Sequence, residues 1–249
     1  MVAAASQGIG FACAEALARE GCRVSICGRK QPEIEAAASK IGPGHRGYVC
    51  DVSLPEDLEK WFASTLADLG PPAILVTNTG GPPAGSVVDM TDEQWAAGIQ
   101  STLMNVIRMV RLASPHMQDA KWGRIVHITS LVAKEPSRLL PISTTLRHGL
   151  MALTKLQAWE LATSAVTVNG VLPGHTLTDR QRHLAEIRAG KEGISFDEAM
   201  KRQMEGTAMK RFADPGEIAS VVAFLCSESA GYVSGVSLLV DGATTCAVG

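Results

Sequence analysis

Short apolar runs rich in β-branched residues alternate along the chain with longer stretches of amphipathic pattern. Several of the short runs are apolar throughout, which is typical of strands that are covered on both faces. The short runs predict strands at 22–27, 46–50, 73–77, 124–129, 166–172 and 236–240. The longer stretches have the 3.6-residue period of helices. They predict helices at 8–20, 31–41, 55–69, 92–118, 142–164 and 215–227.

This alternation of strand and helix predicts an α/β protein with a doubly wound parallel sheet, right-handed crossovers and helices on both faces. The 249 residues contain no internal repeat, low-complexity tract or linker, so we expect a single domain over 1–249. The segment 176–213 interrupts the rhythm with a polar, mixed-charge sequence. It predicts a helical insertion over the open end of the sheet, where it could act as a lid.

Local signals mark several helix starts. Ser53 could cap the third predicted helix, and Thr91 or Asp92 could cap the fourth. Pro215, directly after Asp214, is typical of a first helical turn. At the N-terminus only residues 1–3 precede a glycine-containing turn, which is about half a strand. Either the first strand is unusually short or the sequence starts downstream of its natural beginning, and we favour the second reading.

Composition narrows the classes of function. Hydrophobic residues make up 46% of the chain and charged residues 19%, with a net charge of -2, which fits a well-cored globular protein and does not favour nucleic acid or an acidic membrane as a partner. No apolar run approaches the roughly 20 residues of a membrane helix, and no signal peptide is evident. Six scattered cysteines lack metal-ligand spacing, so we expect reduced thiols in a cytoplasmic protein and no metal site.

The first candidate site lies in the turn before the first predicted helix. The segment Ala4-Ala5-Ser6-Gln7-Gly8-Ile9-Gly10 runs directly into an alanine-rich helix. Small residues let backbone amides approach a pyrophosphate, and a helix N-terminus favours the anion. Two glycines in this spacing also occur in ordinary tight turns. The prediction of a pyrophosphate site therefore depends on where the segment lies, after an apolar run and before a helix. The candidate cofactor-binding residues here are Ser6, Gln7, Gly8, Ile9 and Gly10.

Further segments follow in a fixed order along the chain. They are Asp51-Val52, Thr77-Asn78-Thr79-Gly80, Ser130, Pro173-Gly174-His175-Thr176-Leu177-Thr178 and Val240-Asp241-Gly242. Together with the glycine turn, their order and spacing resemble the short-chain dehydrogenase/reductase family, and within it the 3-oxoacyl-carrier-protein reductase-like branch. The resemblance covers the whole chain. It implies a Rossmann-type fold and a nicotinamide cofactor.

The resemblance assigns cofactor contacts position by position. It implies that Asp51 and Val52 hold the adenine edge, that Asn78 and Gly80 belong to the segment after the fourth strand, and that Pro173, Gly174 and Thr178 hold the nicotinamide amide. One departure is in the glycine turn, where Ala3 and Ala4 replace the family's threonine and first glycine. An alanine at this point tightens the turn without forbidding binding.

The end of the second predicted strand indicates which dinucleotide binds. Arg29 lies about twenty residues beyond the glycine turn, where an acid would select NAD and an arginine can pair with the 2′-phosphate of NADP. No acid ends this strand, so NADP is favoured over NAD. Alternatively, Arg29 and Lys30 are solvated loop cations.

The catalytic positions depart further from the family pattern. The resemblance implies a serine that orients the substrate oxygen, a proton-donating tyrosine, a lysine one turn later and an asparagine in the preceding long helix. Here these positions hold Ser130, Ser143, Arg147 and Thr102, so only the serine is kept. A serine hydroxyl is a poor proton donor near neutrality, and an arginine cannot shuttle a proton. Arg147 could still hold the cofactor ribose or polarise the substrate.

No shift of alignment restores the tyrosine, since the two in the chain, Tyr48 and Tyr232, lie in other regions. Lys134, His148 and His175 are candidate substitute donors, although each also has a purely structural interpretation.

The sequence therefore predicts an NADP(H)-dependent oxidoreductase that interconverts a ketone and a secondary alcohol by hydride transfer, with Ser130, Ser143 and Arg147 at the reacting end. One alternative is a nucleotide-binding pseudo-enzyme without turnover. Another is non-redox use of the fold, as in halohydrin dehalogenases, which also carry arginine for lysine but keep the tyrosine. The resemblance further implies a homotetramer or dimer built on 103–117 and 142–164.

Overall fold

Every strand within the part of the chain that the structure describes, residues 1–246, runs parallel to its neighbours in this computed structural model. The strands are β1 (Ser25–Gly28), β2 (Arg46–Val49), β3 (Ile74–Thr77), β4 (Gly123–Ile128), β5 (Val166–Pro173) and β6 (Ser237–Val240). All residues of β4 and β5 are buried, as their apolar sequences predicted. The side chains on both faces of these central strands therefore face protein rather than solvent.

The N-terminal residues 1–5 join the two halves of the sheet. The ladder β2-β1 and the ladder β3-β4-β5-β6 do not contact each other directly. Val2 lies between them and pairs in parallel with Ile26 of β1 and Val76 of β3. Its backbone N–H donates to the carbonyl of Ser25 at 2.9 Å, and the next N–H, of Ala3, donates to Val76 at 3.0 Å. The short first strand expected from the sequence is thus reduced to one bridge on each side.

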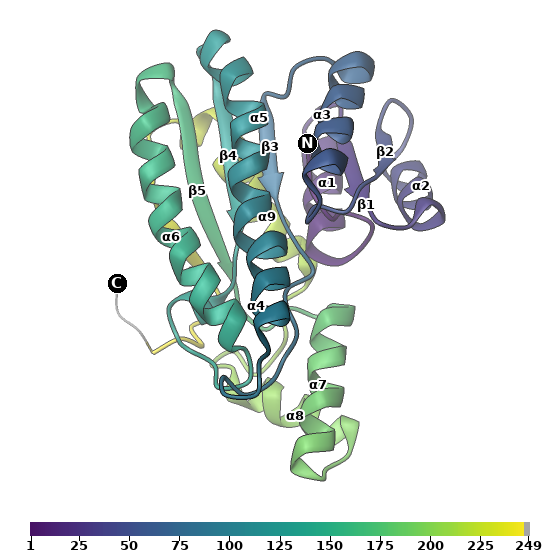
Figure 1. The fold of residues 1–249 in the computed structure, drawn as a ribbon, viewed down its shortest axis with the longest axis vertical. Helices are drawn as coiled ribbons and strands as arrows, with labels where there is room; N and C mark the ends of the chain where they lie inside the picture. Colours follow the sequence, from purple (N-terminus) through teal and green to yellow (C-terminus); the bar gives the residue numbers. More distant parts are fainter. Residues whose placement is uncertain (247–249) are drawn as a thin grey trace.

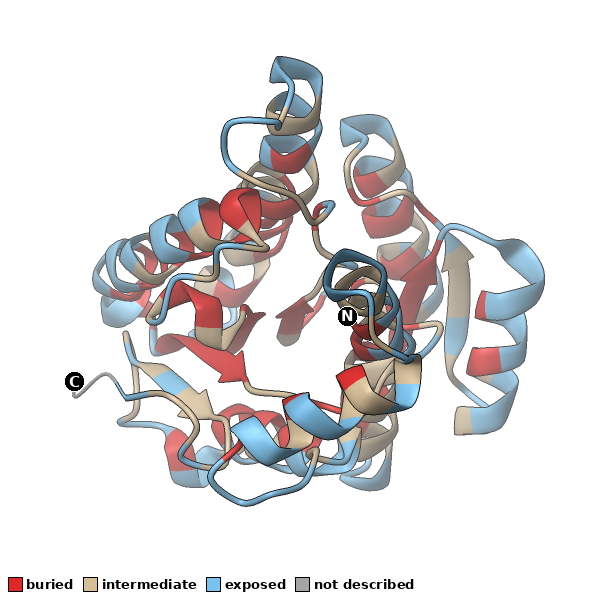
Figure 2. Ribbon diagram, turned by 90° about the horizontal axis from the view of Figure 1, so that it is seen from below, coloured by how far each residue is buried: buried red, intermediate tan, exposed pale blue. Residues whose placement is uncertain are grey.

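Helices cover both faces of this sheet (Figure 1), which confirms the predicted doubly wound architecture. One face carries α1 (Gly8–Arg19), α2 (Gln31–Ile41) and α9 (Pro215–Cys226), whose buried side chains form one apolar core. The other face carries α3 (Pro55–Leu69), α5 (Asn105–Asp119) and α6 (Pro141–Leu161), which form a second core. Figure 2 shows buried residues on the strands and on the inward sides of these helices.

The long helix predicted at 92–118 is interrupted. It consists of α4 (Asp92–Ile99), a π-helical turn η1 (Gln100–Met104) and α5. Such π-bulges are rare and are found frequently at functional sites. Three 3₁₀ turns complete the described chain: η2 (Leu131–Ala133), η3 (Ala162–Ser164) and η4 (Glu228–Ala230).

The predicted helix caps have different outcomes. Thr91 caps α4, because its hydroxyl accepts from the backbone N–H of Gln94 at 3.3 Å. Asp214 caps α9, because its carboxylate accepts from the backbone N–H of Gly216 at 2.7 Å. The prediction for Ser53 was wrong. Leu54 occupies the cap position of α3 without a side-chain bond, because the Ser53 hydroxyl instead donates to the carboxylate of Asp51 at 2.7 Å.

The insertion at 176–213 is helical, as predicted. It contains α7 (Asp179–Glu192) and α8 (Phe196–Gly206), which pack on each other and project beyond the carboxyl ends of the strands (Figure 1). A bridge between Thr176 and Ala213 closes the base of the insertion. No helix among the described residues has the length and apolarity needed to cross a bilayer. All six cysteines are described and are free thiols.

Ala4 adopts a left-handed backbone conformation, with φ of 47°. This conformation brings the Cβ of an L-residue close to its own carbonyl and costs about 1–2 kcal/mol, which glycine avoids. The resulting turn directs the Ala4 carbonyl toward Asn78, whose Nδ2 donates to it at 3.1 Å. The family's glycine at this point is thus replaced without a change in backbone direction.

Replacing Ala4 with glycine should therefore stabilise the protein by about 1 kcal/mol, measured as a higher midpoint of urea unfolding. The matched control is Ala5→Gly. Ala5 is fully buried and its φ is not positive, so this change should lower stability by about 1 kcal/mol. Equal losses of stability in both variants would show that the Ala4 backbone is not strained.

Candidate functional site

The carboxyl ends of β1, β2, β3, β4 and β5 open into one elongated cavity of about 660 Å³. Its walls come from the glycine turn, from the loops that follow these strands, from the start of α6 and from the first turn of α7. In an open parallel sheet, ligands bind at this edge, at the point where the strand order reverses. Here that point lies beside Val2, between β1 and β3.

All but one of the predicted site residues line this cavity. They are Ser6, Gln7, Gly8, Ile9, Arg29, Asp51, Val52, Asn78, Gly80, Ser130, Ser143, Arg147, Pro173, Gly174 and Thr178. Residues from seven separated segments are thus brought together. Their roles in binding or catalysis remain predictions.

Gly10, the exception, lies beneath the cavity. A Cβ at this position would lie 2.6 Å from the Ala4 carbonyl oxygen and 2.7 Å from Nδ2 of Asn78, so only glycine lets α1 pack this closely on the turn. Gly8, with φ of 60°, faces the opposite wall, where Thr178 Cγ2 lies 3.4 Å from the position of a Cβ. Gly10 therefore sets how closely α1 packs on the turn, and Gly8 how closely the turn approaches Thr178.

Gly174 permits another close contact. A Cβ on Gly174 would lie 2.6 Å from the Cα of Asp241. The segment after β5 therefore packs directly on the backbone after β6. This contact holds the start of the loop that leads to Thr178.

The far end of the cavity carries an exposed cation. Arg29 lines it and makes no ion pair in the described structure, whereas the neighbouring Lys30 is paired with Glu33 at 2.8 Å. The carboxylate of Asp51 accepts from the backbone N–H and the hydroxyl of Ser53, at 2.9 and 2.7 Å. Arg29 is therefore available to an anionic ligand, while Asp51 is held in place by its own loop.

At the other end, Ser130 and Ser143 are both on the cavity wall. Ser130 follows β4, and its Oγ accepts from the backbone N–H of Val132 at 3.4 Å, which leaves the hydroxyl hydrogen available to a ligand. Ser143 is buried in the first turn of α6, where its Oγ accepts from Nε of Arg147 at 3.1 Å. The i, i+4 spacing on α6 produces this contact.

Arg147 is buried, with 6% of its surface exposed, and is held from three directions. Besides Ser143, its Nη1 donates to the carbonyl of Ile128 at 3.1 Å and, more closely, to that of Thr129. Burial, and secondarily the charge of Arg180, lower the pKa of Arg147 to about 10, so it remains cationic at neutrality. The guanidinium therefore ties α6 to the end of β4.

Arg180 is a cavity residue that the sequence analysis missed. It lies in the first turn of α7, two residues after Thr178, and its Nη2 donates to the Pro82 carbonyl at 2.6 Å. The loop containing Gly81 and Pro82 lies between it and Arg147. The only sequence signal was its position directly after a predicted cofactor contact, which alone does not distinguish it from Arg182, an exposed residue on the same helix.

The candidate substitute proton donors lie outside this wall. The ring of His148 contacts the Ala133 carbonyl at 2.9 Å, and the ring of His175 contacts Gln181 at 3.3 Å, and neither ring lines the cavity. Lys134 is also absent from the lining. None of these three residues therefore forms part of the cavity wall.

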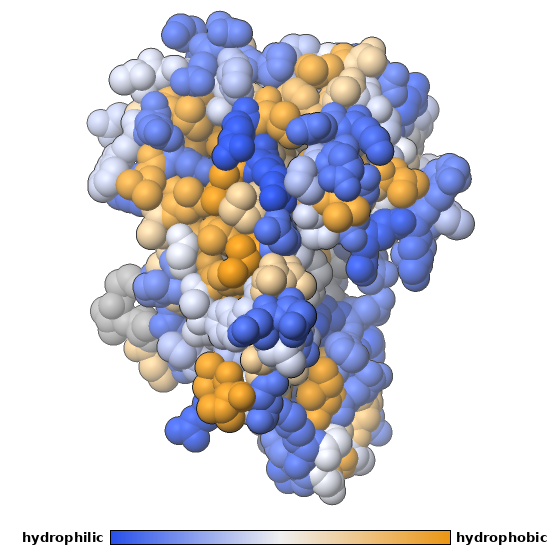
Figure 3. All heavy atoms as spheres, in the orientation of Figure 1, coloured by the Kyte–Doolittle hydropathy of each residue, from blue (hydrophilic) through white to orange (hydrophobic). Residues whose placement is uncertain are grey.

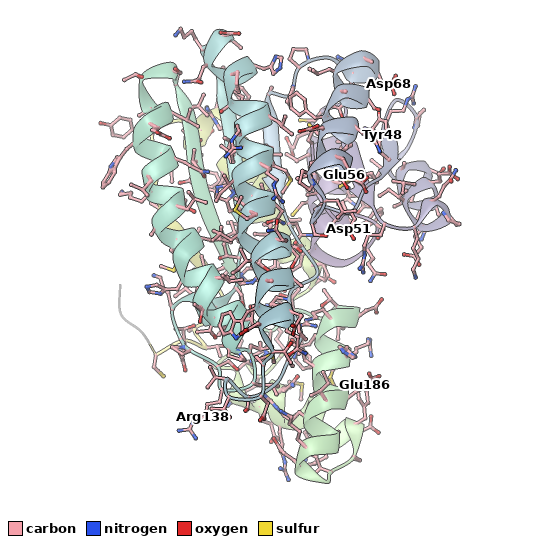
Figure 4. All side chains as sticks on the ribbon, in the orientation of Figure 1. Tyr48, Asp51, Glu56, Asp68, Arg138 and Glu186 are labelled. Atoms are coloured by element: carbon pink, nitrogen blue, oxygen red, sulfur yellow. The ribbon has the colours of Figure 1, made fainter. Side chains whose placement is uncertain are left out.

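The two tyrosines are equally remote. The hydroxyl of Tyr48 donates to Asp68 at 2.7 Å, and Figure 4 shows this pair near the amino ends of the strands, away from α7. Burial and Asp68 raise the pKa of Tyr48. Tyr232 is fully exposed and does not line the cavity.

Thr102, which stands at the position of the family's asparagine, lies inside the π-helical turn η1 and is fully buried. Its hydroxyl has no hydrogen-bond partner among the described residues, nor does Nδ2 of the buried Asn105 one turn later. Position 102 therefore lies in a π-helical turn and holds a threonine in place of the family's asparagine.

Comparison with known proteins gives consistent matches along the whole chain. The family described as enoyl-(acyl carrier protein) reductase matches residues 3–245. The D-beta-hydroxybutyrate dehydrogenase of Cupriavidus necator is 32% identical, over 97% of this chain and 95% of that protein. Human dehydrogenase/reductase SDR family member 4 is 33% identical, over 98% of this chain and 86% of that protein. A putative ketoacyl reductase of Streptomyces coelicolor is 31% identical, over 97% and 95%.

Solved structures show the same likeness. A single-residue variant of the actinorhodin polyketide ketoreductase, solved with NADPH, superposes with a TM-score of 0.94 at 29% identity, over 98% of this chain and 95% of that one. The L-sorbose reductase of Gluconobacter frateurii, complexed with NADPH and L-sorbose, superposes with a TM-score of 0.93 at 29% identity. The match covers 99% of this chain and 96% of that one.

Replacing Arg147 with lysine should destabilise the protein by about 1–3 kcal/mol, although the charge is retained. One ammonium group cannot reach Ser143 and two backbone carbonyls in the geometry of a guanidinium fork. The loss is measured as a lower urea midpoint at unchanged slope. Arg182→Lys, at an exposed site, is the matched control and should change stability by less than about 0.5 kcal/mol. An equal response of both variants would contradict a structural role for the Arg147 fork.

Proposed function

Because the chain belongs to the short-chain dehydrogenase/reductase family, in its 3-oxoacyl-carrier-protein reductase-like branch, we propose that it is an NADP(H)-dependent oxidoreductase that interconverts a ketone and a secondary alcohol. The observation that carries the proposal is the single cavity that runs from Arg29, past the glycine turn, to Ser130, Ser143 and Arg147. A dinucleotide with a reacting group at one end needs a site of this elongated kind.

The residues present fit such a cofactor. The glycine turn presents the N-terminus of α1 to the cavity, which suits a pyrophosphate. Gly8 and Gly10 make the close backbone approach possible. The matching solved structures include the polyketide ketoreductase variant and the L-sorbose reductase, each complexed with NADPH, and a reductase described as NADPH dependent, which supports NADP for this chain. Asn78 and Thr178 would hold the nicotinamide half, and Arg29 would pair with the 2′-phosphate.

At the reacting end, the bound cofactor would supply a hydride to the carbonyl carbon of the substrate. Ser130 would donate a hydrogen bond to the carbonyl oxygen. Ser143 would donate a second, and Nε of Arg147 would strengthen it because a cationic donor polarises the serine hydroxyl. The developing alkoxide is thus stabilised by fixed dipoles and a buried charge rather than by a proton held on a phenol.

The proton itself then comes from water. Within the described structure, the ionisable side chains that line the cavity are three arginines, Cys50 and the two carboxylates Asp51 and Asp179, with no tyrosine, histidine or lysine. Histidine, the most frequent general acid in enzymes, is therefore missing from the wall, as are tyrosine and lysine. The same observation favours the second candidate function, nucleotide binding without turnover.

Two further proposals concern context. The helical insertion containing α7 and α8 would act as a lid, since the first turn of α7 lines the cavity. The chain would form a cytoplasmic homo-oligomer through α6, which exposes Leu156 and Trp159 with 54% and 67% of their surfaces accessible. Figure 3 shows apolar side chains on the face covered by α5 and α6.

Removal of the Arg29 side chain should change cofactor preference. We expect Arg29→Ala to weaken NADPH binding about 10- to 100-fold and to leave NADH binding unchanged, because only NADPH carries the 2′-phosphate. Fluorescence titration of both cofactors measures this. Lys30→Ala, which removes a cation already paired with Glu33, is the control and should have little effect. Equal losses for NADPH and NADH would argue against the phosphate contact.

Ketone reduction should depend on Ser130 and respond little to pH. With a panel of ketones and NADPH, Ser130→Ala should lower kcat/KM by about 100-fold or more, since it removes a donor to the oxyanion. Ser137→Ala, in the nearby loop but outside the cavity wall, should not. Because the pKa of Arg147 is about 10, the rate should stay flat between about pH 6 and about pH 9.

If no ketone or secondary alcohol reacts while NADPH still binds, the second candidate function is correct. A clear titration of the rate near neutrality would instead indicate a proton donor that moves into the cavity when substrate binds.

A further inference from the structure

Two arginine side chains converge on the substrate end of the cavity without an acidic partner. Gly81 lies between them in the left-handed region, with φ of 79°. The point where a Cβ of Gly81 would sit is 3.6 Å from Nη2 and 3.7 Å from Nε of Arg180, and 3.8 Å from Nη2 of Arg147. Both guanidinium groups therefore border the same small volume, which the absence of a side chain at position 81 leaves open.

Each guanidinium has donors to spare. Arg147 uses Nε and Nη1 for its bonds to Ser143, Ile128 and Thr129, and its Nη2 makes no hydrogen bond within residues 1–246. Arg180 has one hydrogen bond, from Nη2 to Pro82, so its Nε and Nη1 are unused in the described structure. None of these nitrogens is among the fully buried side-chain atoms without a partner, so they are open to the cavity that both residues line. A ligand there that accepts hydrogen bonds could reach both cations.

No carboxylate of the described chain supplies this partner. Neither arginine takes part in an ion pair there, although eight such pairs occur elsewhere in residues 1–246. Of the two acids on the cavity wall, Asp51 is occupied by Ser53, and Asp179 is exposed at the start of α7. Burial lowers the pKa of both arginines, and the charge of Arg180 lowers that of Arg147 further. A bound anion would relieve both effects.

We propose that Arg180 and Nη2 of Arg147 form a carboxylate-binding subsite, so that the substrate is a small oxo acid or hydroxy acid rather than a neutral ketone. Planar guanidinium groups bind carboxylates in two-point geometry, which a lone lysine ammonium does not provide. The inference rests on the proposed function, because it places the anion beside Ser130 and Ser143. Arg147 then uses different atoms for two contacts. Its Nε donates to Ser143, and its Nη2 would donate to the carboxylate of the substrate.

Binding without turnover tests the subsite. The protein saturated with NADPH is titrated with racemic 3-hydroxybutyrate, an alcohol that cannot react with the reduced cofactor, and the change in NADPH fluorescence gives the Kd. The methyl ester of the same compound is the uncharged match. The six-carbon homologue and its ester repeat the comparison at a greater chain length. We expect each acid to bind the wild-type protein at least about 10-fold more tightly than its ester.

Substitution of Arg180 should remove that preference. Arg180→Gln should weaken binding of the acid about 10- to 100-fold and leave the Kd values of the ester and of NADPH within about twofold. Arg180→Lys should recover part of the preference. Arg182→Gln, two residues later on the exposed side of α7, should change none of these values.

Two results would overturn the proposal. One is a wild-type protein that binds acid and ester equally. The other is an Arg180→Gln variant that loses NADPH affinity about 10-fold or more at an unchanged ratio of acid to ester, which would assign the anion to the cofactor pyrophosphate instead. If NADPH itself does not bind, the proposed function fails separately. The same acid–ester comparison is then made on the free protein by thermal shift, where a preference lost in Arg180→Gln would still support the subsite.

Discussion

The pairing of residues 1–5, centred on Val2, with strands on both sides is the constraint on which the rest of the structure depends. Without it, the ladder β2-β1 would have no hydrogen-bonded connection to β3 and the remaining strands. The chain leaves Val2 at the centre of the sheet and must turn at once into α1, so the turn is short and its carbonyls are crowded. The left-handed backbone of Ala4, the positive φ of Gly8 and the tight packing of Gly10 follow from this geometry. The cavity opens where the two halves diverge, which is why its walls come from both.

A second constraint operates at the opposite wall. In a parallel sheet the loops after the strands are free to vary, so something must fix them relative to the helices that follow. The guanidinium of Arg147 does so by bonding the last carbonyls of β4 and Ser143 of α6 at the same time. Lysine has one nitrogen and could not make these contacts together. Ser143 and Arg147 therefore form one hydrogen-bonded unit in this wall.

The sequence predicted the elements well because buried parallel strands and amphipathic helices leave strong periodic signals. It also predicted which segments meet at the cavity, since the carboxyl ends of parallel strands share one edge. It did not predict the π-helical turn within 92–118, which continues the helical pattern and differs only in its hydrogen bonding. It placed a cap at Ser53, whose hydroxyl is instead bonded to Asp51. Arg180 was missed for a similar reason: its importance comes from Gly81 and Pro82, about a hundred positions earlier in the chain, and no local pattern encodes that contact.

The two ends of the cavity thus differ in how they depart from the family. At the cofactor end, alanine replaces glycine in the turn, but the backbone direction and the close contacts of Gly8, Gly10 and Gly174 are kept. At the reacting end, proton-transferring groups are replaced by groups that stay charged or neutral across the physiological range. Buried cations without acids are costly to maintain unless a ligand compensates them. Here two guanidinium groups border the same part of the cavity and neither has an ion-pair partner among the described residues. The paired arginines therefore favour a site that still binds an anion over one that has only ceased to transfer protons.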